Sequence, residues 1–214
     1  MTRILICEDD SRFRRMLVKL LSATEGLEVV GEAGSGEDAC EKARSLAPDL
    51  LLLDLELPGI GGLEVIEHLV PHGAGAQIEI LVLTTFADET MLFEAMRRGA
   101  AGYLVKGIAA TKLAAAIREV MAGGTVIESR LARRFWNYFA SVQGSSGEDF
   151  GLTEEELEVL TLVGRGLSNP EAASVLGFSR RAVKGHLERI YRKLDVSSRV
   201  EATVKALQAG LIEL

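Results

Sequence analysis

Residues 49–62, DLLLLDLELPGIGG, hold the pattern that decides the fold. The leucine run Leu50–Leu53 is typical of a strand that is covered on both faces, as in a parallel sheet. The run ends at Asp54, and Pro58-Gly59 then turns the chain into a helical pattern. Ligands of open α/β sheets bind at the carboxyl ends of strands, so Asp54 is a candidate functional residue. An ordinary strand-ending Asp that caps the next turn is the alternative, and this stretch alone does not decide between them.

Strand and helix patterns alternate on both sides of this stretch. The strand patterns are Arg3–Cys7, Leu27–Ala33, Leu50–Asp54, Ile78–Thr84 and Gly102–Val105. The helical patterns are Ser11–Ala23, Ser35–Leu46, Gly62–Leu69, Asp88–Arg98 and Ile108–Ala122. Such alternation predicts an α/β domain over residues 1–124, with a five-stranded parallel sheet, right-handed crossovers and helices on both faces.

Residues 125–214 carry helical patterns only. Glu128–Val142 has an apolar side and precedes the small, polar stretch 143–151, so residues 125–150 are predicted to be a linker that contains a helix. Residues 151–214 are predicted to form a small all-α domain. Its four helices have the candidate caps Thr153, Ser168 or Asn169, Ser179, and Ser197 or Ser198. The tight turn Gly177-Phe178-Ser179 between the second and third helices predicts a helix-turn-helix.

Composition and charge narrow the possible functions. No hydrophobic run is long enough to span a bilayer, and the apolar run Ile4–Cys7 is too short for a signal peptide. Cys7 and Cys40 lack the spacing of a metal or redox site, so we expect a reducing cytoplasm and no membrane contact. The net charge of −7 lies on residues 1–149 and disfavours nucleic-acid binding by the whole chain. Residues 150–214 are neutral overall but gather their basic residues in one segment.

Polar groups follow four of the five predicted strands. They are Glu8, Asp9 and Asp10 after the first, Asp54 after the third, Thr84 at the end of the fourth and Lys106 after the fifth. Because the strands are parallel, these groups meet at one edge of the sheet. Crowded carboxylates need a cation or a proton to relieve their repulsion, and oxygen ligands with water suit Mg²⁺.

This arrangement predicts phosphoryl chemistry. Beside a divalent ion, Asp54 can act as a carboxylate nucleophile and form an aspartyl-phosphate. Lys106 would neutralise the phosphoryl oxygens, and the Thr84 hydroxyl would hydrogen-bond one of them. Each residue alone could also have no functional role, for example as a surface lysine or a strand-end hydroxyl. Their joint placement at strand ends makes the site the better interpretation.

Four motifs resemble response-regulator receiver domains across residues 3–122. They are CEDD at 7–10, LLLDLELPGIGG at 51–62, VLTT at 82–85 and GAAGYLVK at 99–106. The resemblance implies a flavodoxin-like sheet with strand order 2-1-3-4-5. It also implies that Asp54 accepts a phosphoryl group from a sensor histidine kinase.

The resemblance further implies the roles of individual residues. Mg²⁺ would be bound by Asp9, Asp54 and the backbone carbonyl of Glu56, with Glu8 acting through water. Asp10 lies at a variable position and is left out of the metal site. Thr84 and Tyr103 would act as the switch pair, with Tyr103 turning inward on phosphorylation. After Lys106 the proline or Ser-Pro cap common in the family is missing, and Gly107 begins the segment instead.

The third helix of the C-terminal part is basic on its outer face. Val183, Leu187, Ile190 and Leu194 form its apolar side. The residues outside this side include Arg180, Arg181, Lys184, Arg189, Arg192 and Lys193. A solvated amphipathic helix would also show this pattern. The order of residues over 152–212 resembles the LuxR-type DNA-binding domain, and together the two parts resemble the NarL/FixJ class of regulators.

This second resemblance implies how double-stranded DNA is bound. Lys184 and its neighbours Arg181 and Gly185 would contact the major groove, and flanking basic residues would contact phosphates. Glu188 could accept a hydrogen bond from a cytosine amino group, but we favour an ion pair with Lys184 or Arg192. The last helix would mediate dimerisation.

We therefore predict a phosphorylation-regulated, homodimeric, DNA-binding transcription regulator that is not an enzyme. Its partners would be a sensor histidine kinase and double-stranded DNA, with RNA polymerase as a further candidate. A Mg²⁺-dependent phosphatase is one alternative, although Glu56 stands where its second Asp would be expected. The other alternative is a phosphorylation-independent regulator in which the receiver serves only as a dimerisation module.

Overall fold

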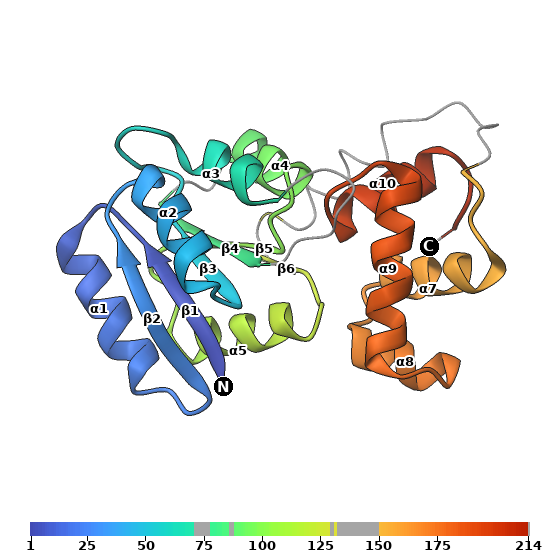
Figure 1. The fold of residues 1–214 in the computed structure, drawn as a ribbon, viewed down its shortest axis with the longest axis horizontal. Helices are drawn as coiled ribbons and strands as arrows, with labels where there is room; N and C mark the ends of the chain where they lie inside the picture. Colours follow the sequence, from blue (N-terminus) through green and yellow to red (C-terminus); the bar gives the residue numbers. More distant parts are fainter. Residues whose placement is uncertain (71–77, 86–87, 129–130, 132–149, 214) are drawn as a thin grey trace.

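The computed structural model describes residues 1–70, 78–85, 88–128, 131 and 150–213. Its N-terminal part is built around one parallel sheet with the strand order β2-β1-β3-β4-β5-β6 (Figure 1). The strands are β1 (Thr2–Cys7), β2 (Leu27–Ala33), β3 (Leu50–Leu53), β4 (Glu79–Thr84), β5 (Gly102–Val105) and β6 (Val126–Ile127). The first five strands and the 2-1-3-4-5 order confirm the prediction.

The predicted number of strands was one too few, because a sixth strand forms within the expected linker. In β6, Val126 lies opposite Gly102 and Ile127 lies opposite Tyr103. A Cβ atom on Gly102 would lie only 3.0 Å from the Val126 carbonyl oxygen, so the glycine permits this close approach. Two residues are too short to show a strand period. The helix predicted for residues 128–142 lies outside the described residues, apart from its two positions 128 and 131.

Helices cover both faces of the sheet (Figure 1). One face is covered by α1 (Ser11–Ser22) and α5 (Ala110–Met121), and the other by α2 (Gly36–Leu46), α3 (Gly62–Leu69) and α4 (Glu89–Arg97). Leu50 and Leu52 point into the first layer, and Leu51 and Leu53 into the second. All four are fully buried, which is why the leucine run is unbroken. Burying each such side chain contributes about 1.5–3 kcal/mol, so β3 anchors the sheet.

The C-terminal part is a bundle of four helices. They are α7 (Glu154–Gly164), α8 (Asn169–Leu176), α9 (Arg180–Leu194) and α10 (Arg199–Gln208). Gly177 ends α8 with a φ of 70°, and the Ser179 side chain accepts a hydrogen bond from the Ala182 N–H to begin α9. The apolar side of α9 forms the core of the bundle, as predicted. None of the described helices is both long and apolar enough to span a membrane.

Candidate functional site

The carboxyl edge of the sheet brings three acidic side chains together. Asp54 directly follows β3, and its N–H donates to the Cys7 carbonyl oxygen at 2.9 Å, which extends the pairing with β1. Glu8 and Asp9 directly follow β1. One carboxylate oxygen from each of the three acids lies within 4.8 Å of the others. Glu8 and Asp54 are buried, whereas Asp9 is exposed, so the cluster opens to solvent on one side.

Lys106 reaches into this cluster from the end of β5. Its Nζ lies 2.7 Å from Glu8 Oε2 and 2.7 Å from Asp54 Oδ2. Burial acts to lower the pKa of Lys106, but its hydrogen bonds to Asp54 and Glu8 outweigh burial and raise the pKa. The backbone N–H of Lys106 donates to the Thr84 carbonyl oxygen at 2.7 Å, so the ends of β4 and β5 are joined beside the acids. The ammonium therefore stays charged and points at Asp54.

The chemistry of these donors fits a divalent cation. Burial raises the pKa of Glu8, because a charged carboxylate is disfavoured away from water. A hard cation would relieve that cost and would bind carboxylates such as those of Asp9 and Asp54. The cluster is therefore consistent with the binding of Mg²⁺.

The side chain of Glu56, in the loop after Asp54, is not part of the cluster of three acids. The Glu56 N–H donates to Asp54 Oδ1 at 3.3 Å, while its side chain accepts a hydrogen bond from Thr85 Oγ1 at 2.5 Å. Sequence reasoning missed Thr85, although it directly follows the switch candidate Thr84. The role of the Glu56 backbone carbonyl stays a prediction.

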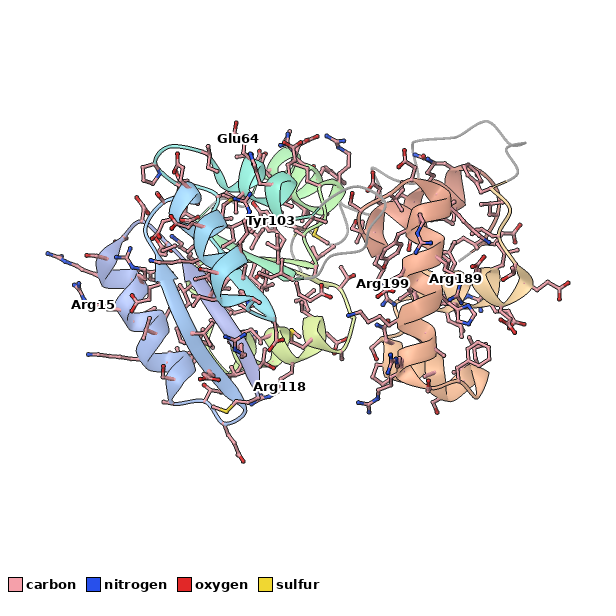
Figure 2. The ribbon with its side chains drawn as sticks, viewed as in Figure 1. Arg15, Glu64, Tyr103, Arg118, Arg189 and Arg199 are labelled. Carbon is pink, nitrogen blue, oxygen red and sulfur yellow. The ribbon has the colours of Figure 1, made fainter. Side chains whose placement is uncertain are left out.

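Both switch candidates are fully buried. Thr84 ends β4, and Tyr103 lies in β5, inside the core layer shared with Ile127 and Leu131 (Figure 2). Val200 of α10 also belongs to that layer. Tyr103 already points inward in this conformation, so a switch on phosphorylation would start from the inward position.

The predicted DNA-contacting residues divide into two groups. Arg180, Arg181, Lys184, Glu188 and Arg192 are exposed, and Gly185 is partly buried. Arg189 and Lys193 are exposed as well, but they are also paired with the buried Glu156 of α7, at Nε–Oε1 3.3 Å and Nζ–Oε2 2.7 Å. Contacts of these two residues with DNA phosphates stay a prediction.

The pair favoured for Glu188 is not formed. Within the described part of the chain, Glu188 has no ion pair with Lys184 or Arg192, and it lines a cavity between the two parts of the chain instead. The competing interpretation, a contact to a base, stays open.

Comparison with known proteins decides the family. A model of the response regulator receiver domain matches residues 4–118, and a model of bacterial regulatory proteins of the luxR family matches residues 151–206. The chain is a LuxR-family response regulator.

Relatives match this response regulator along its whole length. The transcriptional regulatory protein LnrK of Bacillus subtilis is 34% identical and covers 99% of both chains. The response regulator GacA of Pseudomonas protegens is 33% identical over 100% of this chain and 99% of its own. A crystal structure of ChrA, a response regulator in a heme-sensing two-component system, is 28% identical, has a TM-score of 0.53 and covers 99% of this chain and 98% of its own. The protein is therefore a phosphorylation-regulated DNA-binding regulator of transcription and not an enzyme, with a histidine kinase and DNA as its classes of partner.

The receiver and DNA-binding domains of this regulator are in direct contact. The Asn169 N–H donates to the Ala122 carbonyl oxygen at 3.1 Å, and Ser198 Oγ donates to the Met96 carbonyl oxygen at 3.1 Å. Arg199 lies on the side of α10 that faces the receiver and donates to the Gly123 carbonyl oxygen (Figure 2). A cavity of about 230 Å³ lies between the domains, and its lining includes Asp49, Glu79, Lys184, Glu188 and Tyr191.

This contact lies at the opposite edge of the sheet from Asp54. Asp49 precedes β3 and Glu79 begins β4, whereas Asp54 follows β3. The Lys184 side of α9 faces that edge, and Val200 and Val204 of α10 pack against the core layer of α4. The receiver therefore packs against α10 and faces part of α9 across the cavity.

Proposed function

We propose that Asp54 is the phosphoacceptor of this regulator. The observation that supports this most is the buried Asp54 carboxylate, which Lys106 contacts at 2.7 Å within the acidic cluster. The Asp54 oxygen would attack the phosphorus of a phosphohistidine in a sensor histidine kinase, and the bond from phosphorus to the imidazole nitrogen would break. Lys106 neutralises charge on the phosphoryl oxygens, and the Thr84 hydroxyl hydrogen-bonds one of them.

Magnesium is the cofactor that this donor set supports. Asp9, Asp54 and the backbone carbonyl of Glu56 would bind it, with Glu8 acting through water. When bound, Mg²⁺ neutralises the crowded acids and the charge that develops during phosphoryl transfer.

DNA binding is assigned to the exposed face of α9. Lys184, Arg181 and Gly185 would contact the major groove, while Arg180 and Arg192 would contact phosphates. Lys184 also faces the receiver, so the receiver and DNA compete for one surface. Phosphorylation would favour separation of the domains, which frees α9 and the apolar side of α10.

The freed α10 would then pair with a second copy, giving a homodimer that binds two half-sites. We place the receiver at residues 1–124, the linker at 125–150 and the DNA-binding domain at 151–214. Within this scheme the protein acts in the cytoplasm, and RNA polymerase stays a candidate partner.

Phosphate labelling tests the assignment of Asp54. The full chain is incubated with acetyl phosphate and Mg²⁺, and the added phosphate is measured by mass spectrometry. Asp54→Asn is expected to abolish labelling. Asp10→Asn is the matched control, because Asp10 caps α1 and Asn caps equally well, so its labelling is expected to equal that of the wild type. Labelling that persists in Asp54→Asn would contradict the proposal.

A further inference from the structure

Phe13 of α1 lies against the lysine of the proposed phosphorylation site. The Lys106 ammonium lies 4.9 Å from the centroid of the Phe13 ring, within range of a cation–π interaction. The position of the ring is fixed by the same loop that carries the acids. Asp10 Oδ1 accepts hydrogen bonds from the N–H groups of Arg12 and Phe13, at 2.7 and 3.3 Å, and so begins α1 directly after Glu8 and Asp9.

The backbone after Lys106 restrains this lysine little. Gly107 follows it with a φ of 95°, and a Cβ atom there would meet no neighbour within 4 Å. The contacts that hold the ammonium are those of the side chain, with Glu8, Asp54 and the Phe13 ring. Ile108, the next residue, packs against the same core layer as Phe13. The ring therefore lies within cation–π range of the ammonium and shares a core layer with the loop that follows Lys106.

The three side-chain partners of Lys106 differ in what they can do during the reaction. Glu8 and Asp54 both accept from the ammonium here, but in the proposed function both are engaged by the ion or the phosphoryl group. An aromatic ring binds neither a hard cation nor a phosphoryl group, so Phe13 is the partner that remains among the residues that the structure describes. The Lys106 side chain is only 15% exposed, so little water competes with the ring face.

We propose that Phe13 is a positioning residue, which holds the Lys106 ammonium over the site while Glu8 and Asp54 change partners. This inference rests on the proposed function of Asp54 and Lys106. Phe13 itself does not touch the reacting atoms. It acts by keeping the ammonium where the phosphoryl oxygens arrive.

Two substitutions of Phe13 separate the effect of the aromatic ring from the effect of side-chain volume. Phe13→Leu keeps an apolar side chain but removes the ring, and Phe13→Tyr keeps the ring. The full chain is labelled with acetyl phosphate and Mg²⁺, a small donor that avoids effects on kinase docking. Phe13→Leu is expected to lower the labelling rate at saturating donor about two- to tenfold, the range of a partly buried cation–π contact, while Phe13→Tyr labels at the wild-type rate. The donor concentration at half-saturation is expected to stay unchanged in both.

A double-mutant cycle with Lys106→Met shows whether Phe13 acts through the lysine. We expect Phe13→Leu to cause no further loss in that background. An equal slowing in both backgrounds, or equal slowing by Leu and Tyr, would overturn the proposal. If Lys106→Met labels no phosphate at all, the comparison of Leu with Tyr alone decides.

Two controls distinguish the ring contact from a loss of helix stability and from a failure of the site itself. Val18→Ala weakens packing in the same helix away from the ammonium, and its labelling rate is expected to equal that of the wild type. Slowing by this variant would assign the Phe13 effect to stability of α1 and overturn the inference. If the proposed function itself were wrong, the result would differ. The Asp54→Asn or Lys106→Met variant would then be labelled to the same extent as the wild type.

Discussion

Glu156 holds α9 against α7 inside the DNA-binding domain. Its side chain is 2% exposed and accepts hydrogen bonds from Lys193, from Arg189 and from the Thr153 N–H. Glu156→Gln removes the charge that balances the two cations. We expect it to lower the free energy of unfolding by about 1–3 kcal/mol, the usual cost of disrupting a buried charged hydrogen bond. Amide hydrogen exchange in α9 measures this loss, with the exposed Glu158→Gln as the matched control.

The same carboxylate makes the domain sensitive to acid. Burial acts to raise the pKa of Glu156, but the hydrogen bonds from Lys193 and Thr153 outweigh burial, and the pKa is lowered from its ordinary value of 4.5. The stabilisation is therefore present above pH 4.5 and is lost as the pH falls through the lowered pKa. In the wild type, we expect the protection of α9 amides from hydrogen exchange to fall as the pH decreases below 4.5. A Glu156→Gln variant with the same pH dependence would contradict this account.

The residues of the proposed phosphorylation site could be predicted from the sequence where their position follows from the order of parallel strands. Glu8, Asp54 and Lys106 each follow a strand, and parallel strands end at one edge. Phe13 gave no separate signal, because an apolar residue in an amphipathic helix also fits the core. Charge alone likewise could not tell that Arg189 is paired, since its partner lies 33 residues away in the sequence.

At the scale of elements, β6 ties the start of the linker to the candidate switch Tyr103. The Glu128 N–H donates to the Tyr103 carbonyl oxygen at 2.9 Å, and the Val126 N–H donates to the Ala101 carbonyl oxygen at 3.3 Å. Ile127 and Leu131 lie in the core layer of Tyr103. The linker therefore starts on the sheet. A movement of Tyr103 would shift the Glu128 backbone that is hydrogen-bonded to it.

Val126→Pro tests this tie. Proline has no N–H, so the hydrogen bond to Ala101 is lost and β6 should separate from β5. We expect amide exchange at Glu128 to become faster by about tenfold or more, because its protection depends on the strand pairing. Val126→Thr keeps the donor and is expected to leave exchange at Glu128 unchanged. Unchanged exchange in the proline variant would show that β6 does not hold the linker.

The long elements were predictable and this short one was not. The unbroken leucine run of β3 and the helical period on the apolar side of α9 are both visible in the sequence, and both patterns match the observed burial. The strand β6 depends on tertiary pairing with Gly102, which no local pattern in residues 125–128 reveals.

At the scale of the molecule, Glu79 lies where the domains meet. Burial raises its pKa, and the nearby cations Lys184 and Arg199 act to lower it. Glu79→Lys would place a third cation beside these two, at the edge of the sheet opposite Asp54. We expect the domains to separate, with a larger radius of gyration in small-angle X-ray scattering and tighter DNA binding without phosphate. Glu79→Gln is the matched control and should remain compact, and a compact Glu79→Lys would contradict the assigned interface.

In the proposed function, phosphate on Asp54 controls access of α9 to DNA. The most direct measurement is capture of a random duplex library by the full chain, with and without acetyl phosphate and Mg²⁺, followed by sequencing. We predict sequence-specific enrichment that increases with the phosphodonor in the wild type and does not increase in Asp54→Ala. Enrichment of the same sequences to the same extent in all of these samples would contradict the account and would favour a regulator that works without phosphorylation.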